Sequence, residues 1–395
     1  MKILIFSSAS IIKTNRAYIR RLSEYKNVTV HLCILYRGVL SFADENSKFY
    51  NEPYSITLHE LKGRHPRIET IYDFKSIVKS FDPTHIFLEF DPASKLVVDV
   101  IKTAKKYNNQ VKIGCLVVEN RNKYFIKDAI YCLKKRSLKL FLGNLLCHYY
   151  NNISLKRLNY IFPISKESCH VYFNLGYSKN IIHQIPLGID RSIFFNKGLD
   201  QRVKMRANLN LHSFTIAYFG RLVPEKGIHI LIEALSLLEF NDWQLLIDNF
   251  ETYKTSYSIE IKNLLSKYGL ENQIVFFDSK HEDMPQFYNA IDLLVLPSIE
   301  TENFKEQYGR VLVEAMLTRT FVIGSDTGAI PEILNDKYLV FKSGDSLSLA
   351  NKISEIRYLL EKQKNELLNK NFDNATVNLS SERQAEILHS VILNS

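Results

Sequence analysis

Two glutamates eight residues apart are the strongest candidates for chemistry in the sequence. Glu306 and Glu314 lie in the segment KEQYGRVLVEAM, residues 305–316, with Gly309 between them. The apolar run LLVL ahead of this segment predicts a strand and the pattern after Gly309 predicts a helix, which puts Glu306 in the loop and Glu314 in the second helical turn. The glycine lets the backbone approach a ligand closely, and N–H groups at a helix start can receive phosphate oxygens. The alternative is an ordinary amphipathic helix with solvated glutamates.

A second turn carries two cations that suit a diphosphate. Arg221 and Lys226 lie in FGRLVPEKG, residues 219–227, directly after the predicted strand FTIAYF. Guanidinium and ammonium groups at a strand end can hold a diphosphate and stabilise the negative charge that grows as it leaves. Taken alone, this turn is equally compatible with two solvated surface cations.

A third strand-to-helix turn reads SDTGAIPEI, residues 325–333. Pro331 suits the first turn of a helix, because its fixed backbone angle is helical and no N–H donor is needed there. A packing role and a contact with a ligand are equally compatible with this turn.

Short apolar runs alternate with helical patterns in both halves of the chain, which predicts βαβ units and parallel sheets. The chain has 395 residues, and single hydrophobic cores stop growing near ~250–300 residues, so two domains are expected. We expect a Rossmann-like domain over residues 1–195, a second over 196–375, and a C-terminal helix over 376–395 that packs back towards the first. Ligands of such sheets bind beyond the carboxyl ends of the strands, where the three motifs fall.

The three motifs, in this order and spacing, resemble the retaining GT-B glycosyltransferases of glycosyltransferase family 4, the "glycosyl transferases group 1" domain. FGRLVPEKGIHILIEAL is similar to the G-R-x-x-x-x-K-G turn of that family, KEQYGRVLVEAM to its E-x7-E segment, and SDTGAIPEIL to its S-x-x-G-x-x-E-I turn. QIPLGIDRSIF, residues 184–194, is similar to the strand that leads into its donor domain. The resemblance implies an α/β GT-B fold, in which two doubly wound Rossmann-like domains face each other across a cleft. It also implies transfer of a sugar from a nucleotide-diphosphate sugar.

The resemblance implies a role for each matching residue. Arg221 and Lys226 correspond to the pair that binds the donor diphosphate, and Glu306 corresponds to the residue that contacts the transferred sugar. Glu314 corresponds to the residue that binds the ribose hydroxyls. The remaining donor-binding positions are Gly220, Tyr308, Gly309, Arg310 and Val311. In this family the leaving phosphate helps to deprotonate the acceptor on one face of the sugar, so the implied mechanism is retaining and needs no metal and no cofactor.

The first half resembles the family only loosely. Residues 7–14, SSASIIKT, lack the Gly-Gly turn that many members carry after the first strand. The predicted strand at residues 110–118 is followed by Glu119 and Asn120, where many relatives present a histidine towards the transferred sugar. Both side chains offer acceptor oxygens, so we expect one of them to line the cleft and face the donor sugar. The alternative is that both are solvated loop residues.

Charge is unevenly distributed along the chain. Residues 1–200 carry 31 Lys and Arg against 16 Asp and Glu, whereas residues 201–395 carry 20 against 26. Within residues 122–150, cations mix with apolar residues. This pattern is compatible with a stretch that lies on anionic lipid headgroups, or with a core-packed helix that has a solvated basic face. Nucleic-acid binding is not expected, because no DNA- or RNA-reading motif accompanies the charge.

The sequence also bears on location. The apolar run at the amino terminus is too short for a signal peptide, and no segment offers the ~18 uninterrupted apolar residues that span a bilayer. The five cysteines form no C-x-x-C pair, so neither a zinc site nor a disulfide framework is expected. We therefore expect a cytoplasmic enzyme, peripheral on the inner face of the plasma membrane, that acts on a glycan or lipid-linked acceptor in bacterial surface polysaccharide or lipopolysaccharide biosynthesis.

Two other functions are compatible with two facing α/β domains. One is a sugar phosphate enzyme such as a phosphorylase or a nucleotide-sugar epimerase, which the pairing of the E-x7-E segment with the G-R-x-x-x-x-K-G turn disfavours. The other is a catalytically silent scaffold that binds a partner glycosyltransferase or the membrane. A silent copy has no chemical reason to keep all four charged residues of the motifs.

Overall fold

A computed structural model gives the fold of two compact units. The first unit consists of Met1–Gly188 and Ser381–Ser395, and the second of Ile189–Ser380. The chain therefore passes between the units twice, at residues 188–189 and 380–381. The residues that the structure describes are 1–37, 51–63, 68–121, 125–250, 254–278, 283–302 and 304–393.

Unit 1 contains a six-stranded sheet with the order β3-β2-β1-β4-β5-β6, in which all neighbouring strands are parallel. Its strands are β1 Lys2–Ser7, β2 Thr29–Tyr36, β3 Ser55–Glu60, β4 His85–Leu88, β5 Lys112–Val117 and β6 Tyr160–Pro163. Its longer helices are α1 Ala17–Ser23, α3 Phe74–Phe81, α4 Lys95–Tyr107, α5 Phe125–Lys134, α6 Leu138–Leu155, α7 Lys166–Asn174 and α16 Ser381–Leu393.

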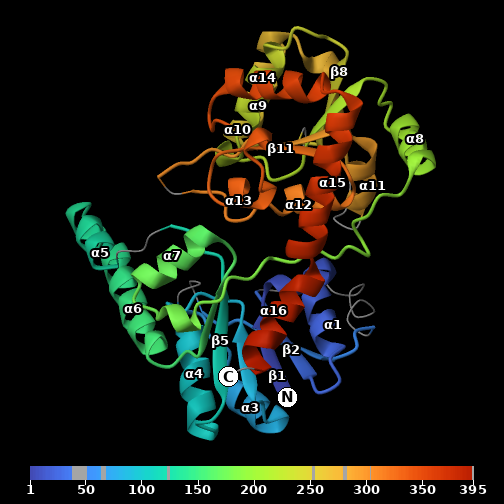
Figure 1. The fold of residues 1–395 in the computed structure, drawn as a ribbon. Helices are drawn as coiled ribbons and strands as arrows, with labels where there is room; N and C mark the ends of the chain where they lie inside the picture. Colours follow the sequence, from blue (N-terminus) through green and yellow to red (C-terminus); the bar gives the residue numbers. More distant parts are fainter. Residues whose placement is uncertain are drawn as a thin grey trace. The chain divides into compact units, whose positions relative to one another are not determined.

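Helices cover both faces of this sheet, which explains why β1, β4, β5 and β6 are largely buried and apolar without alternation, whereas the edge strand β3 is mostly polar and has no buried residue. Leu4 and Phe6 of β1 belong to one core with side chains of α3 and α4. Ile3 and Ile5 belong to a second core with side chains of α1 and α16. The C-terminal helix α16 thus lies beside α1 in unit 1, although the two are far apart in the sequence (Figure 1).

Unit 2 repeats this architecture with a parallel six-stranded sheet in the order β12-β11-β10-β7-β8-β9. Its strands are β7 Phe214–Tyr218, β8 Trp243–Asp248, β9 Ile274–Phe277, β10 Leu293–Leu296, β11 Phe321–Ser325 and β12 Val340–Phe341. Its longer helices are α8 Leu199–Asn208, α9 Ile228–Ser236, α10 Ser256–Tyr268, α11 Met284–Ala290, α12 Arg310–Leu317, α13 Ile330–Leu334, α14 Ser346–Arg357 and α15 Glu361–Asn378. The predicted fold class, two doubly wound α/β domains, is confirmed.

The basic stretch predicted at residues 122–150 begins with residues 122–124, which lie outside the described residues. The rest of it forms α5 and most of α6, two helices that pack against each other. Figure 1 shows this helical pair extending from unit 1.

Candidate active site

The three sequence motifs come together at the carboxyl edge of the unit 2 sheet. They follow β7, β10 and β11, which are neighbours in the sheet, so their loops start from the same edge. Backbone hydrogen bonds join the loops. The Ile299 N–H donates to the Glu225 carbonyl at 2.9 Å, and the Ala329 N–H donates to the Glu306 carbonyl at 3.0 Å. The cation turn, the glutamate segment and the third turn therefore form one connected site.

Glu306 is held by side chains from two of these loops. The residue is buried, with 7% of its surface exposed. Its Oε2 accepts a hydrogen bond from Lys226 Nζ at 2.5 Å and another from Ser298 Oγ at 2.7 Å. A buried carboxylate needs such partners, because its desolvation is otherwise costly. The structure thus brings together Lys226 and Glu306, two residues that the sequence singled out in separate motifs.

Glu314 lies in the second turn of α12, as predicted, and is also buried. Its Oε2 accepts a hydrogen bond from the Tyr288 hydroxyl of α11 at 2.6 Å. The Arg310 guanidinium, one turn earlier on α12, lies with Nε 3.8 Å from Glu314 Oε1. Burial, followed by the charge of Glu314, raises the pKa of Tyr288 well above its usual range. The phenol therefore remains a neutral donor that orients the carboxylate.

The start of α12 is suited to an anion. Gly309 is the N-cap residue, with a φ of 80°, and has no side chain that could bond the first amides of the helix. Glycine is favoured there because L side chains avoid this region of φ. The amides of Arg310 and Val311 open the helix, and helix amino ends of this kind receive phosphate oxygens. Tyr308, immediately before the glycine, is buried.

Arg221 differs from Lys226 in that its side chain is exposed. The backbone of its turn is fixed by the Tyr218 hydroxyl, which donates to the Arg221 carbonyl at 2.8 Å. The same hydroxyl explains the glycine at position 220, because a Cβ there would lie 2.7 Å from it. The turn is therefore rigid in its backbone while the guanidinium remains accessible to a ligand.

Two further glycines determine how closely the loops approach one another. A Cβ on Gly227, at a φ of +70°, would lie 1.9 Å from the Pro297 carbonyl oxygen. A Cβ on Gly328, at a φ of +57°, would lie 2.0 Å from the Glu306 carbonyl oxygen. Gly328 belongs to the third motif, whose role in the sequence was open between packing and ligand contact. In the structure, Gly328 packs against the backbone of Glu306.

Sequence reasoning missed the hydrogen-bonding partners of both glutamates. Ser298 follows β10 directly, and its position at the end of a strand could have identified it as a residue of the ligand edge. Tyr288 lies within α11 and belongs to no motif, so only the packing of α11 against α12 brings it to Glu314.

In unit 1, Glu119 and Asn120 follow β5 at the carboxyl edge of that sheet. Glu119 Oε1 accepts a hydrogen bond from the Arg121 N–H at 3.1 Å. Asn120 is buried, so the alternative that both residues are solvated is wrong for Asn120. At the same edge, Glu89 accepts hydrogen bonds from the Tyr18 hydroxyl, at 2.5 Å, and from the Ser7 hydroxyl. The contact of Glu119 or Asn120 with a donor sugar stays a prediction.

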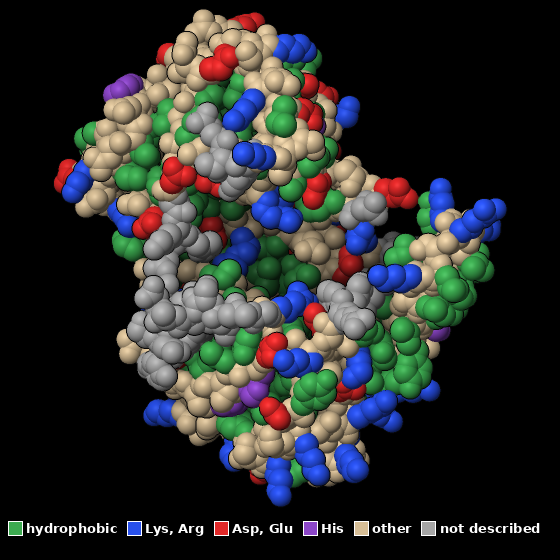
Figure 2. Space-filling model, turned by 180° about the vertical axis from the view of Figure 1, so that it is seen from behind, with side chains coloured by type: hydrophobic (Ala, Val, Ile, Leu, Met, Phe, Trp, Pro, Cys, Tyr) green, Lys and Arg blue, Asp and Glu red, His purple; other side chains and the backbone are tan. Residues whose placement is uncertain are grey.

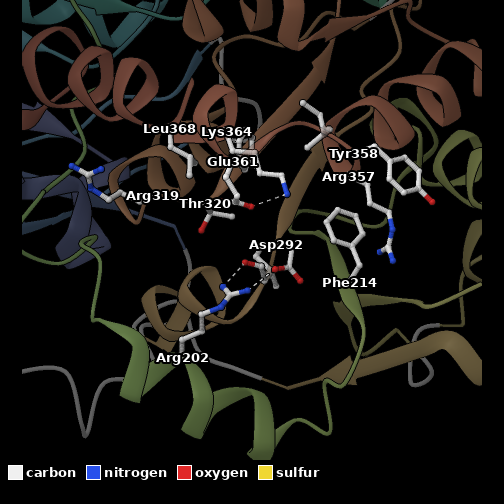
Figure 3. A pocket seen from close by; sticks show the side chains of 13 residues that line it. Arg202, Phe214, Asp292, Arg319, Thr320, Arg357, Tyr358, Glu361, Lys364 and Leu368 are labelled. Atoms are coloured by element: carbon white, nitrogen blue, oxygen red, sulfur yellow. Dashed lines mark hydrogen bonds and ion pairs between the residues drawn. The ribbon is translucent and has the colours of Figure 1, made fainter. Parts of the chain in front are cut away.

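A separate pocket of about 550 Å³ lies at the opposite, amino edge of the unit 2 sheet (Figure 3). Phe214 and Phe321, the first residues of β7 and β11, are part of its lining. Two ion pairs lie among its charged lining groups. Arg202 lies 2.5 Å from Asp292, and Lys364 lies 3.3 Å from Glu361. The lining contains no residue of the three motifs, so this pocket is distinct from the candidate active site.

Two kinds of feature are absent from the described residues. No group of three or more His, Cys, Asp or Glu side chains in that part of the chain could hold a metal ion. No helix there is long and apolar enough to cross a membrane. The five cysteines are all free thiols, and Cys33, Cys115 and Cys147 are buried.

The sequence of the chain is similar to those of known glycosyltransferases, chiefly over unit 2. The family model "Glycosyl transferases group 1" matches residues 201–375, the part of the chain that carries all three motifs. The capsular polysaccharide biosynthesis glycosyltransferase CapM of Staphylococcus aureus is 28% identical over 205 residues, which cover 50% of this chain and 51% of CapM. The mannosylfructose-phosphate synthase of Agrobacterium fabrum is 28% identical over 152 residues, which cover 37% of this chain and 32% of the synthase. The matched segments thus span about half or less of these relatives' own lengths.

The fold comparison extends over both units. The crystal structure of Anabaena HepE in complex with UDP and glucose superposes with a TM-score of 0.73 at 18% sequence identity, covering 100% of both chains. Identity this low establishes the fold alone. The chain therefore has the two-domain α/β fold of known glycosyltransferases. Together with the family match over unit 2, the comparisons support a glycosyltransferase.

Proposed function

We propose that the chain is a retaining, metal-independent glycosyltransferase that transfers a sugar from a nucleotide-diphosphate sugar to a glycan or lipid-linked acceptor. The observation that carries the proposal is the arrangement around Glu306. Lys226 and Ser298 hold its carboxylate on the loop that leads into α12, whose first turn has no side-chain cap. A carboxylate for sugar hydroxyls, cations for a diphosphate and helix amides for phosphate oxygens are the groups that a nucleotide-sugar requires.

The proposed chemistry assigns a task to each of these groups. The acceptor hydroxyl oxygen attacks the anomeric carbon of the donor, and the bond from that carbon to the diphosphate oxygen breaks. The nucleoside diphosphate leaves with the electron pair and takes up the proton of the acceptor hydroxyl. Arg221, Lys226 and the amides at the start of α12 stabilise the growing charge of the leaving group. Glu306 binds a hydroxyl of the transferred sugar, and Glu314 binds the ribose hydroxyls.

Lys226 can contribute to this chemistry without releasing Glu306. An ammonium group has three donors, so one can remain on the carboxylate while another binds a phosphate oxygen. The sugar-binding carboxylate and the phosphate-binding cation would then be connected directly. The proposal includes action on the cytoplasmic side of a bacterial membrane, in the synthesis of a surface polysaccharide or lipopolysaccharide, with an anionic membrane surface as a partner of the basic stretch in unit 1.

A panel of nucleotide-sugars tests the proposal. Purified protein should show a rise in melting temperature with one donor, as expected for a ligand that binds only the folded state. That donor should then support transfer or slow hydrolysis, EDTA should leave the rate unchanged, and NMR should show a product with the anomeric configuration of the donor. Binding without any turnover would favour the alternative, a catalytically silent scaffold. A strict metal requirement or an inverted product would contradict the stated mechanism.

A further inference from the structure

The helical pair α5–α6, residues 125–155 and here called the hairpin, is anchored to unit 1 at one end. Phe125 and Cys147 pack with Ala93 and Leu175 in a small apolar cluster. Near the end of α6, Ser154 Oγ donates a hydrogen bond to the Pro92 carbonyl at 2.8 Å. The Tyr177 hydroxyl donates to Asn151 Oδ1 at 3.0 Å. These contacts fix the base of the hairpin, whereas the residues around its turn have high exposure.

The second helix of the hairpin, α6, exposes a row of apolar side chains to solvent on the side that faces away from the rest of unit 1. Four apolar residues recur at the spacing of helical turns and are exposed by 39–61%, namely Leu138, Leu142, Leu145 and Tyr149. The buried residues of α6 lie on the opposite side of the helix, namely Cys147, Tyr150, Asn151 and Ser154. A helix that only packs on its own domain turns its apolar face inward and its polar face to water. The outer face of α6 is therefore built to contact something apolar.

The first helix of the hairpin carries a second exposed apolar stripe. Ile126, Ile130 and Leu133 recur at the same helical spacing on α5, and all three are exposed. Figure 2 shows the extending arm of unit 1 from behind, with apolar side chains in green next to basic side chains in blue. Exposed apolar side chains concentrated on two neighbouring helices mark an interaction site.

The charge of the hairpin indicates what the site contacts. Residues 125–155 contain five basic residues and a single acidic one, Asp128. The basic residues are Lys127, Lys134, Lys135, Arg136 and Lys139, and all five are exposed. Four of the five lie at the turn between the helices. Apolar side chains bordered by cations match a layer that presents negative charge at its surface and hydrocarbon beneath it.

We infer that the α5–α6 hairpin docks unit 1 on an anionic lipid bilayer, with its cations at the headgroups and its outer apolar side chains inserted between them. The inference rests on the proposed function, because it names the surface at which that enzyme would meet a lipid-linked acceptor. It goes beyond electrostatic attraction, since the apolar stripe of α6 should retain part of the protein on vesicles when salt screens the charges.

Vesicle sedimentation of the full chain tests this inference without any donor or acceptor. Wild-type protein should bind vesicles of phosphatidylglycerol and phosphatidylcholine, and bind pure phosphatidylcholine vesicles far more weakly. Replacing Lys134, Lys135 and Lys139 by Gln should lower the partition coefficient roughly 100-fold, since each cation near an anionic surface contributes severalfold. Replacing Leu138, Leu142 and Leu145 by Gln should abolish the fraction that stays bound at 1 M salt.

A matched control removes the same charge from another surface of unit 1. Lys75 and Lys79 on α3 and Lys102 on α4 are exposed, and replacing them by Gln should leave vesicle binding close to that of wild type. Equal losses in the control and hairpin variants would overturn the inference, as would equal binding of wild type to neutral and anionic vesicles. If wild type instead self-associates without binding vesicles, and the leucine variant no longer self-associates, the inference is overturned. The hairpin would then contact a second copy of the chain. Thermal shift with nucleotide-sugars separates the two proposals, because the hairpin variants should bind donor as wild type does.

Discussion

Lys226 and Arg221 lie on the same turn but have different surroundings. Lys226 is paired with the buried carboxylate of Glu306, whereas Arg221 is exposed. Both are expected to bind the diphosphate, so both should matter for turnover. Only Lys226 also neutralises a buried charge in the unliganded protein, so it should matter for stability as well. The sequence placed both cations at the ligand edge but gave no reason to distinguish them, because the partner of Lys226 is 80 residues away.

We expect Arg221→Ala and Lys226→Ala each to lower turnover by ~10²-fold, the usual effect of losing one preorganised stabilising group. Lys226→Ala should also lower the free energy of unfolding by about 3 kcal/mol, because it leaves a buried carboxylate without its ion-pair partner. Arg221→Ala should change that free energy by less than about 0.5 kcal/mol. Steady-state kinetics and urea unfolding measure the two effects. Adding Glu306→Gln to Lys226→Ala should restore part of the lost stability. Equal free energies of unfolding for Arg221→Ala and Lys226→Ala would contradict the expected difference between the two cations.

Asn120 and Glu119 also differ in their surroundings. It is buried at the end of β5, whereas Glu119 accepts a hydrogen bond from the adjacent Arg121 N–H. We expect Asn120→Ala to lower kcat by about 10-fold, as for the loss of one hydrogen bond of ~1 kcal/mol or slightly more. Glu119→Ala, measured with the same fixed donor, is the comparison. Wild-type kcat and KM in both variants would show that this loop has no catalytic part.

At the scale of elements, the sequence was most informative where strands lead into loops. The strand ahead of the glutamate segment, the helix after Gly309 and the second-turn position of Glu314 were predicted correctly, because each is set by local periodicity or by Gly309. The contacts of Glu306 with Ser298 and of Glu314 with Tyr288 were not predictable, because tertiary packing determines them. The hairpin was left open between packing in the core and lying on lipid, because periodicity does not specify which face of a helix meets its own domain.

The close approach of the three loops in unit 2 gives an element-scale prediction. Gly227→Ala and Gly328→Ala should each destabilise unit 2 and weaken donor binding, because the added Cβ would overlap a carbonyl oxygen of the neighbouring loop. Gly269→Ala is a matched control, since Gly269 has a similar φ of +65° and nothing within 4 Å of a Cβ placed there. The control should lose about 1 kcal/mol from backbone strain alone, and thermal unfolding with and without donor measures all three. If Gly269→Ala loses as much stability as the other two variants, then the positive φ, and not the close contact between loops, is the reason for glycine at these positions.

At the scale of the whole molecule, the two units are expected to differ in their response to acid. Burial lowers the pKa of five described histidines, and all five belong to unit 1: His31, His59, His85, His183 and His389. For His85, burial, followed by the charge of Lys112, lowers the pKa to about 4. In unit 2, a hydrogen bond from the Ser348 N–H lowers the pKa of Asp345 below its usual value.

The direction of each pKa shift determines the pH range in which it changes the free energy of unfolding. A histidine with a lowered pKa stays neutral in the folded state, while its unfolded counterpart takes up a proton below the usual value of about 6.5. The shift therefore costs nothing above that pH and destabilises the folded state as the pH falls below it, down to about 4 for His85. The contribution of Asp345 is retained over this range and is lost only at lower pH. Unit 1 should consequently lose stability before unit 2 when the pH falls from 7 to 4.

The chain contains natural probes that separate the two units in this experiment. Its single tryptophan, Trp243, is buried in β8 of unit 2, and all five cysteines lie in unit 1. During acid titration, the buried thiols of Cys33, Cys115 and Cys147 should become reactive towards a disulfide reagent that works at low pH, while Trp243 emission is still native. His85→Gln should move the thiol transition to lower pH, because it removes a partly buried imidazole whose protonation destabilises the folded state. A change in Trp243 emission at the same pH as thiol exposure, or at a higher one, would mean that the units unfold together or in the reverse order.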